Sequence, residues 1–341
     1  MRICQLMASP GVGGMEKHVR ELSLALAAAG HEVVLIGPAA FLATVPDHLD
    51  VPPMQRMAIP AHLSRFNPWL MFKVLLLLRK ARCDIVHAHA SKAAALLASV
   101  QRWIGAPTLA TVHSVKRNLK PYRGMTHLIA VSKQVASAFT AERCSVVYNG
   151  IAQPLPAVLN LHEQFGVPEG MPVIISVGRL VEAKGFDVLL QAIDGLPVCL
   201  LIAGEGALRR SLLQRIRVLQ SPTYCQLLGQ RSDVTAILAA VDAVVIASRR
   251  EGFSYVLNEA LLCGARVLST DVPVANEVLP AALIVPINDA AALRARLQHW
   301  LARPDVWQQQ MQGAHAYAQQ HMTLESMTKA TIAVYQRLLQ P

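Results

Sequence analysis

Two cations in the C-terminal half of the chain could bind a diphosphate. Arg179 and Lys184 lie between an apolar run that ends at Gly178 and a helix that is predicted to begin near Phe186. Open α/β sheets bind ligands beyond the carboxyl ends of their strands, and the N-termini of helices attract anions. This segment therefore fits a phosphate site as well as it fits a loop with two solvated charges.

Two carboxylates farther along the chain could bind sugar hydroxyls. Glu251 precedes a predicted helix, and Glu259 lies about two turns beyond it. A carboxylate can accept two hydroxyl hydrogen bonds side by side, which suits the vicinal diols of a ribose or a hexose. Gly252, followed by Phe253 and Ser254, would let backbone amides approach a ligand. Taken alone, the segment favours the ordinary alternative, in which Glu251 caps the helix and Glu259 lies on the surface.

Two histidines, His87 and His89, lie at the end of another apolar run and point to the same side of it. Such a pair could belong to a metal site. No third ligand is apparent in the sequence, so we predict no metal and no cofactor.

Short apolar runs alternate with helical patterns along the chain, as α/β units require. Apolar residues recur at helical spacing from Met15 to Ala29, and Gly30 ends that helix. The predicted strands of the first series are 3–8, 33–36, 84–87, 108–112 and 127–131, and those of the second are 173–177, 198–203, 225–228, 243–247, 266–269 and 283–285. We predict an α/β protein with two doubly wound, Rossmann-like domains that face a cleft.

A proline-rich stretch separates the two series. The 341 residues exceed the ~100–200 that are usual for one domain. We predict an N-terminal domain at 1–152, a linker at 153–170, a C-terminal domain at 171–320, and a final helix at 321–341 that crosses back to the first domain.

Composition limits the class of protein. Hydrophobic residues make up 53% of the chain and charged residues 16%, which excludes intrinsic disorder. The longest apolar run, 69–78, is shorter than the ~20 residues of a membrane-spanning helix, and the N-terminus lacks the pattern of a secretion signal. We therefore expect a cytoplasmic protein, and the six scattered cysteines fit reduced core residues.

The net charge of +10 comes from the N-terminal half. Residues 1–152 contain 17 Lys and Arg against 7 Asp and Glu, whereas residues 153–341 contain 15 of each. A basic surface favours an anionic partner, which could be a nucleic acid, a membrane or a phosphorylated substrate. Charge alone does not choose among them, but the chain lacks recognisable RNA-binding motifs, so we predict no nucleic-acid partner.

The two segments that contain Arg179, Lys184, Glu251 and Glu259, in this order and after a linker, resemble the retaining glycosyltransferases of family four, among them those of the lipopolysaccharide core. These enzymes have the GT-B fold. Further landmarks that this chain shares with the family are Gly13-Gly14-Met15-Glu16, Asp84-Ile85-Val86-His87-Ala88-His89, Thr111-Val112-His113-Ser114, Tyr148-Asn149-Gly150-Ile151 and Ala203-Gly204-Glu205-Gly206.

The resemblance implies a role for each matching residue. It assigns the donor's phosphates to Arg179 and Lys184, the ribose to Glu259, and the transferred sugar to Glu251. The remaining donor-binding positions that it implies are Gly13, Gly14, Arg231, Gly252, Phe253 and Ser254. His113 matches the position that contacts the sugar and the acceptor, although a strand-end histidine bonded to backbone is the alternative for it. The family also resembles metal-independent enzymes, in line with the absence of a predicted metal.

The acceptor side is expected in the N-terminal domain. A basic cluster, Lys116, Arg117, Lys120 and Arg123, directly follows His113 and could contact a phosphorylated glycolipid or another saccharide acceptor. Residues 56–82 combine basic and aromatic side chains, which suits either the inner face of an anionic membrane or a buried helix with charged ends.

The function that these expectations describe is transfer of a sugar, with retention of configuration, from a nucleotide sugar to a saccharide or lipid-linked saccharide in lipopolysaccharide or other cell-envelope glycan synthesis. A UDP-sugar is the favoured donor. Two departures from the family, Ser254 and the segment at 273–277, put the identity of the sugar in doubt. The alternatives are a nucleotide-sugar epimerase, which would act without an acceptor, and a non-catalytic protein that binds nucleotide sugars or nucleic acid.

Overall fold

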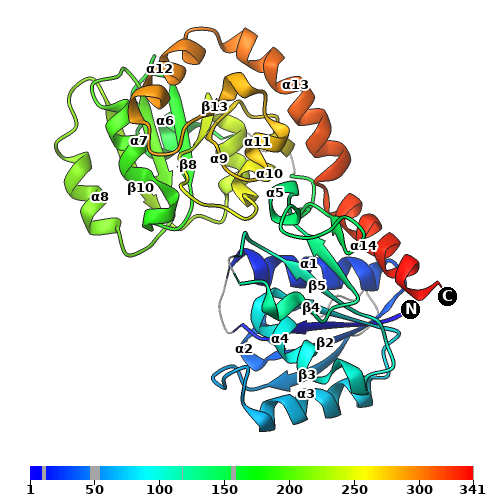
Figure 1. Cartoon of the computed structure of the whole chain (residues 1–341). Helices are drawn as coiled ribbons and strands as arrows, with labels where there is room; N and C mark the ends of the chain where they lie inside the picture. The colour runs from blue at the N-terminus through cyan, green and yellow to red at the C-terminus, as the bar shows by residue number, and fades with distance from the viewer. Residues whose placement is uncertain (10–12, 47–53, 117, 155–158, 341) are drawn as a thin grey trace. The chain divides into compact units, whose positions relative to one another are not determined.

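The computed structural model describes residues 1–9, 13–46, 54–116, 118–154 and 159–340. The chain divides into two compact units (Figure 1). Unit 1 comprises Met1–Ala152 together with His321–Pro341, and unit 2 comprises Gln153–Gln320. Each unit is a parallel α/β sheet with helices on both faces, as the alternating sequence pattern predicts.

The described part of unit 1 has a seven-stranded parallel sheet in the order β3-β2-β1-β4-β5-β6-β7. Its strands are β1 (Arg2–Met7), β2 (Glu32–Pro38), β3 (Gln55–Ile59), β4 (Ile85–His89), β5 (Thr108–Val112), β6 (His127–Ala130) and β7 (Cys144–Val146). Its helices are α1 (Gly14–Ala28), α2 (Ala39–Leu42), α3 (Pro68–Ala81), α4 (Ala90–Val100), α5 (Lys133–Ala136) and α14 (Leu324–Leu339), with 3-10 turns η1 (Gln101–Trp103) and η2 (Lys120–Tyr122). The strand order reverses between β1 and β4.

The described part of unit 2 has a six-stranded parallel sheet in the order β10-β9-β8-β11-β12-β13. Its strands are β8 (Val173–Val177), β9 (Cys199–Ala203), β10 (Tyr224–Gly229), β11 (Ala243–Ile246), β12 (Val267–Thr270) and β13 (Ile284–Val285). Its helices are α6 (Leu161–Phe165), α7 (Phe186–Ile193), α8 (Arg209–Ile216), α9 (Val234–Ala240), α10 (Tyr255–Leu262), α11 (Ala275–Val278), α12 (Ala290–Leu301) and α13 (Pro304–His321), with 3-10 turns η3 (Glu182–Lys184) and η4 (Ala281–Leu283). Here the order reverses between β8 and β11.

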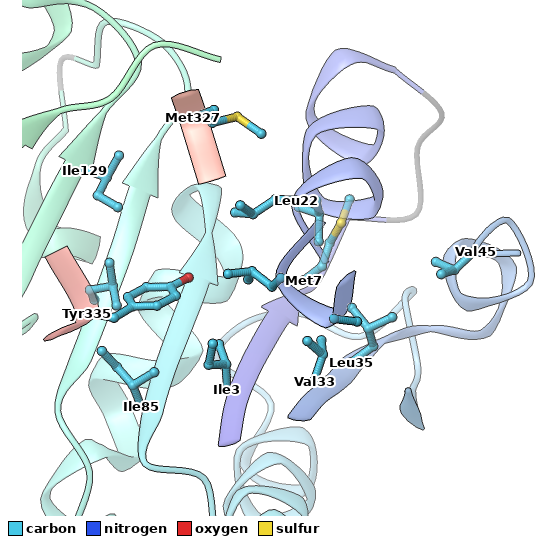
Figure 2. Close-up of a cluster of buried hydrophobic side chains, with 14 of the residues drawn as sticks. Ile3, Met7, Leu22, Val33, Leu35, Val45, Ile85, Ile129, Met327 and Tyr335 are labelled. Carbon is cyan, nitrogen blue, oxygen red and sulfur yellow. The ribbon is translucent and has the colours of Figure 1, made fainter. Parts of the chain in front are cut away.

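The helix α14 completes the core of unit 1. Figure 2 shows Met327 and Tyr335 of α14 in the same buried cluster as Ile3 and Leu22. Thr323 begins the helix with a capping box, in which its side chain accepts a bond from the backbone of Ser326. The last residues of the chain therefore contribute to the first sheet's core.

The predicted strands are all present, with ends that differ by no more than two residues. The structure adds β3 and β7, which the sequence pattern did not predict. In β3 only Met57 and Ile59 are buried, because this strand lies at the edge of the sheet and has no continuous apolar run. The six cysteines are free thiols, as expected. Within the described residues, no helix combines the length and the apolar character that crossing a bilayer would require.

Candidate active site

The loops that follow β8 and β11 form the centre of the candidate site. These two strands are neighbours, yet the chain leaves them toward opposite edges of the sheet. Such a reversal opens a crevice beyond the carboxyl ends of the strands, where open α/β sheets bind ligands. Arg179 and Lys184 belong to the loop after β8, and Glu251 belongs to the loop after β11. Two segments that are distant in the sequence are thus brought together.

Glycines allow the β8 loop to pack closely against its neighbours. Gly185 has a φ of 64°, and a Cβ atom there would lie 2.0 Å from the carbonyl oxygen of Ala247. Gly204 has a φ of 144°, and a Cβ there would lie 1.9 Å from the carbonyl oxygen of Gly178. Only glycine fits both the backbone angles and the space at these two positions.

Arg249 ties the β11 loop to the β8 loop. Its guanidinium makes two bonds of 2.8 Å to the carboxylate of Asp187 and one of 2.8 Å to the carbonyl of Glu182. Its backbone N–H donates to the carbonyl of Ala183 at 2.8 Å. The hydrogen bonds from Arg249 hold the pKa of Asp187 below its usual value. The two loops are therefore fixed by charge-assisted bonds before any ligand binds.

Lys184 and Glu251 form an ion pair at the crevice. The Nζ atom of Lys184 lies 2.5 Å from Oε1 of Glu251, and the hydroxyl of Ser248 donates to the same oxygen at 2.8 Å. Their side chains are 20% and 9% exposed, so the pair is shielded from bulk water without being sealed off. These three residues also line a small pocket together with Ser176 and Ser254. The sequence predicted both charges at the site but did not predict that they contact each other.

Ser254, not Glu251, caps helix α10. The hydroxyl of Ser254 accepts a bond from the backbone N–H of Leu257 at 3.3 Å. The alternative that Glu251 is a helix cap is therefore wrong. Glu259 lies on α10 and is half-buried, whereas Phe253 is buried and its ring contacts that of Tyr255 at 5.5 Å between centroids.

The other two predicted donor cations differ in their surroundings. Arg179 is exposed, and the structure shows no ion pair for it among the described residues. Arg231 follows β10, with β9 between that strand and β8. Its guanidinium makes a two-pronged ion pair with Asp233, at 2.6 and 2.8 Å, and lies over the ring of Phe165. Arg179 is thus available to an anion, whereas Arg231 already has a carboxylate partner.

In unit 1, the predicted reaction-centre residue His113 follows β5 and takes part in a group of histidines. Its ring centroid lies 4.9 Å from that of His18 and 5.7 Å from that of His89. Burial, followed by the charges of His18, His87 and Lys116, holds the pKa of His113 well below its usual value. Its Nε2 atom has no hydrogen-bond partner among the described residues.

The sequence reasoning missed His18, which α1 places in this group. The signal was present as a histidine four residues after Gly14, on the buried face of a predicted helix. Of the predicted acceptor cluster, Lys116 is half-buried and close enough to His113 to affect its pKa, whereas Lys120 and Arg123 are exposed. Arg117 lies outside the described residues. Gly13 has extended backbone, and Gly14 begins α1. Their contact with the donor stays a prediction.

Comparisons with known proteins follow the same division of the chain. The model of glycosyltransferase family 4 matches residues 12–152, and that of glycosyl transferases group 1 matches residues 158–320. A phosphatidyl-myo-inositol mannosyltransferase from Mycobacterium leprae is 26% identical, over 95% of this chain and 93% of that protein. A lipopolysaccharide core glycosyltransferase, LpsE of Rhizobium meliloti, is 26% identical over 61% of this chain and 62% of its own length.

Solved structures share the whole fold. The crystal structure of Anabaena HepE in complex with UDP has a TM-score of 0.85 and 22% identity, covering 99% of this chain and 100% of that chain. The structure of WaaG, a glycosyltransferase involved in lipopolysaccharide biosynthesis, has a TM-score of 0.69 and 17% identity, over 98% and 99% of the two chains. The protein is an enzyme of the family 4 glycosyltransferases, with the GT-B fold.

Proposed function

We propose that unit 2 binds a nucleotide-sugar donor, with a UDP-sugar favoured, and that the enzyme transfers the sugar to a glycolipid or saccharide with retention of configuration. The observation that carries this proposal is the Lys184–Glu251 pair beside the exposed Arg179 at the strand reversal. Two cations and a carboxylate at one crevice match the diphosphate and the hydroxyls of such a donor. The structures of HepE with UDP and with UDP and glucose, which have the same fold, support this choice.

Each residue then has a defined task. Arg179 and Lys184 bind the diphosphate, and Glu251 exchanges its bond with Lys184 for hydroxyls of the sugar. Glu259 binds the ribose. Helix α10 follows β11, so its N-terminus lies toward the carboxyl end of that strand and adds a partial positive charge where the phosphates would lie.

The proposed reaction needs no nucleophilic side chain. The acceptor hydroxyl attacks the anomeric carbon on the face from which the diphosphate leaves, and the departing phosphate oxygen takes the hydroxyl proton. The bond to the leaving phosphate breaks as the new glycosidic bond forms, so configuration is retained. Lys184 and Arg179 stabilise the charge that develops on the diphosphate. Neutral His113 is proposed to contact the sugar and the acceptor on the unit 1 side.

Helix α3 supports an acceptor that resides in a membrane. One face of α3, with Leu70, Val74 and Leu78, is buried in unit 1. The opposite face exposes Trp69 by 56%, Phe72 by 58% and Leu76 by 50%. Lys73 lies over the ring of Trp69, and Arg79 and Lys80 follow. The buried-helix alternative therefore describes only one face, and the other suits an anionic lipid surface. We propose that the enzyme works as a peripheral protein at the cytoplasmic membrane, in cell-envelope glycan synthesis.

The test is a panel of UDP-, GDP- and ADP-sugars, each incubated with the purified enzyme and vesicles that contain phosphorylated glycolipids. We expect one nucleotide class to raise the melting temperature and to give a glycolipid product with the donor's anomeric configuration, read by NMR. Conversion of the donor without an acceptor would instead indicate the epimerase. A protein that no nucleotide or nucleotide sugar stabilises would contradict the proposal.

The α3 surface has its own test. The double variant Trp69→Ser, Phe72→Ser should lower binding to anionic vesicles in a flotation assay by about tenfold, because two large apolar side chains no longer enter the interface. The matched control is Trp103→Ser, in which a half-exposed tryptophan outside α3 is replaced. Equal binding by both variants would show that α3 is not the membrane surface.

A further inference from the structure

The histidine group of unit 1 has the arrangement of a metal site. His18 comes from α1, His89 from the end of β4, and His113 from the loop after β5. One ring nitrogen from each lies within 4.8 Å of the other two. Two of these elements belong to the strands between which the order of the first sheet reverses, since α1 follows β1 and His89 ends β4. All three histidines belong to unit 1.

These histidines have ring nitrogens without partners. Both nitrogens of His18, Nδ1 of His89 and Nε2 of His113 are buried and have no hydrogen-bond partner among the described residues. Buried polar atoms are nearly always satisfied by protein, water or an ion. Several ring nitrogens without partners at one place therefore indicate a ligand that they share.

A hydrogen-bond chain orients His89 for metal binding. Nε2 of His89 donates to Oε1 of Gln5 at 2.6 Å, which leaves the lone pair on the partnerless Nδ1. The amide of Gln5 in turn donates to the hydroxyl of Tyr335 at 3.0 Å, and that hydroxyl donates to Nδ1 of His87 at 2.6 Å. The series of hydrogen bonds ends at Thr111, whose hydroxyl lies 2.6 Å from Nε2 of His87. Metal-binding histidines are commonly fixed in this way by a carbonyl or carboxylate oxygen on the other ring nitrogen.

The histidines are also in the protonation state that a metal requires. Burial lowers the pKa of His18 to about 4, and the nearby side chain of Asn149 partly offsets this shift. Burial, followed by the charges of neighbouring histidines, lowers the pKa of His89 and of His113 far below the usual value. Neutral imidazole is the form that coordinates metals.

We propose that His18, His89 and His113 bind one divalent transition-metal ion of the zinc class, with the fourth tetrahedral position left for water or another ligand. Zn–N bonds of about 2.0–2.1 Å place the three nitrogens about 3.4 Å apart, so small ring rotations must close the group around the ion. His87 is the hydrogen-bonded neighbour and not a ligand. This replaces the sequence expectation of no metal, which considered only His87 with His89.

The ion would bind His113, the residue that is proposed to contact the acceptor. Bound Zn²⁺ should therefore inhibit transfer, and a chelator should restore it. Only this consequence rests on the proposed function, because metal binding itself is measured without any substrate.

The test uses Co²⁺ as a spectroscopic substitute for Zn²⁺ on the metal-free full chain. We expect one equivalent of Co²⁺ to give the intense visible bands of a tetrahedral site, and one equivalent of Zn²⁺ to remove them. The variant His18→Ala should lose the bands or bind at least about tenfold more weakly, and Gln5→Leu should bind about 10–100-fold more weakly. His62→Ala, an exposed histidine of the same unit, is the matched control and should bind as the wild type does.

A second measurement does not depend on how the variants fold. X-ray absorption of the wild type with one equivalent of Zn²⁺ should show three imidazole ligands at about 2.0–2.1 Å. Absence of tetrahedral bands, a zinc shell with fewer than three imidazoles, or equal loss of binding in His62→Ala would overturn the proposal and leave an ordered water as the occupant of the group.

Discussion

The titratable side chains in the loops of unit 2 and in the histidine group of unit 1 differ in their charge. In unit 2 the charges are kept and paired, as in Lys184 with Glu251 and Arg249 with Asp187. In unit 1 the histidines are buried and neutral, and the hydrogen bonds that hold His87 and His89 are made to neutral groups. A paired charge can change partner when a charged donor arrives, whereas a neutral imidazole binds through its lone pair or its N–H group. We therefore expect the stability of unit 1 to depend on pH and ligand binding to unit 2 to depend on its ion pairs.

The largest expected effect is acid destabilisation of unit 1. His18 titrates near 6.5 when unfolded and near 4 when folded, so its contribution is complete above pH 6.5 and is lost as the pH falls toward 4. As the pH falls through this window, each such histidine lowers the free energy of unfolding by about 1.4 kcal/mol per pH unit. The pKa values of His87, His89 and His113 are lowered as well.

Hydrogen exchange at pH 7.5 and pH 5, with a chelator present, measures this effect. Peptides from β1, β4 and β5 should lose protection at pH 5, whereas those from β8 and β11 should keep it. Equal losses in both units would remove the contrast between them.

The second largest effect concerns the charges of unit 2. Lys184→Ala removes a cation from the proposed diphosphate site and leaves Glu251 without its ion-pair partner. We expect kcat to fall about 10²–10³-fold while the melting temperature changes little, because the pair lies at a crevice and not in a core. Transfer assays with saturating donor measure the fall.

Lys329→Ala, on helix α14, serves as the control and should have wild-type kcat. A Lys184→Ala enzyme that keeps more than half of the wild-type kcat would be incompatible with the proposed role of this residue.

A smaller effect is expected from the glycine that lets the two loops meet. Gly185→Ala would place a Cβ against the carbonyl of Ala247 at a φ of 64°. We expect a loss of about 1–3 kcal/mol in the free energy of unfolding, and weaker donor binding as the β11 loop moves away. Gly264→Ala is the control, because its φ of 72° is similar but its Cβ would meet nothing within 4 Å. Urea unfolding of the two variants separates the clash from the backbone angle.

The last effect, expected on stability alone, concerns the hydrogen-bonded series Gln5, Tyr335 and His87 of unit 1. Tyr335→Phe removes the hydroxyl that accepts from Gln5 and donates to Nδ1 of His87. Leaving those buried groups without a partner should lower the free energy of unfolding by about 1–3 kcal/mol, with no change in donor affinity. Calorimetry and donor titration check both parts, and a loss of donor affinity would show that the two regions are not independent.

The sequence predicted the parallel strands because their buried residues are almost continuously apolar, as in Val173–Val177. It did not predict β3, where edge exposure breaks that run. For the candidate site, it predicted Arg179, Lys184, Glu251 and Glu259 by type and order, and their roles stay predictions. It could not reveal that Arg249 ties the loops together, since that contact joins residues 62 positions apart. His18 was missed as a member of the histidine group for the same reason, because its proximity to His89 and His113 arises only from the fold of the chain.

The most direct test of the central assignment is hydrogen exchange of the wild-type enzyme with and without UDP. The account predicts new protection in peptides that cover 178–185 and 248–256, the loops after β8 and β11, and loss of that protection in Lys184→Ala. UDP binding that protects other segments and leaves both of these loops unchanged would contradict it.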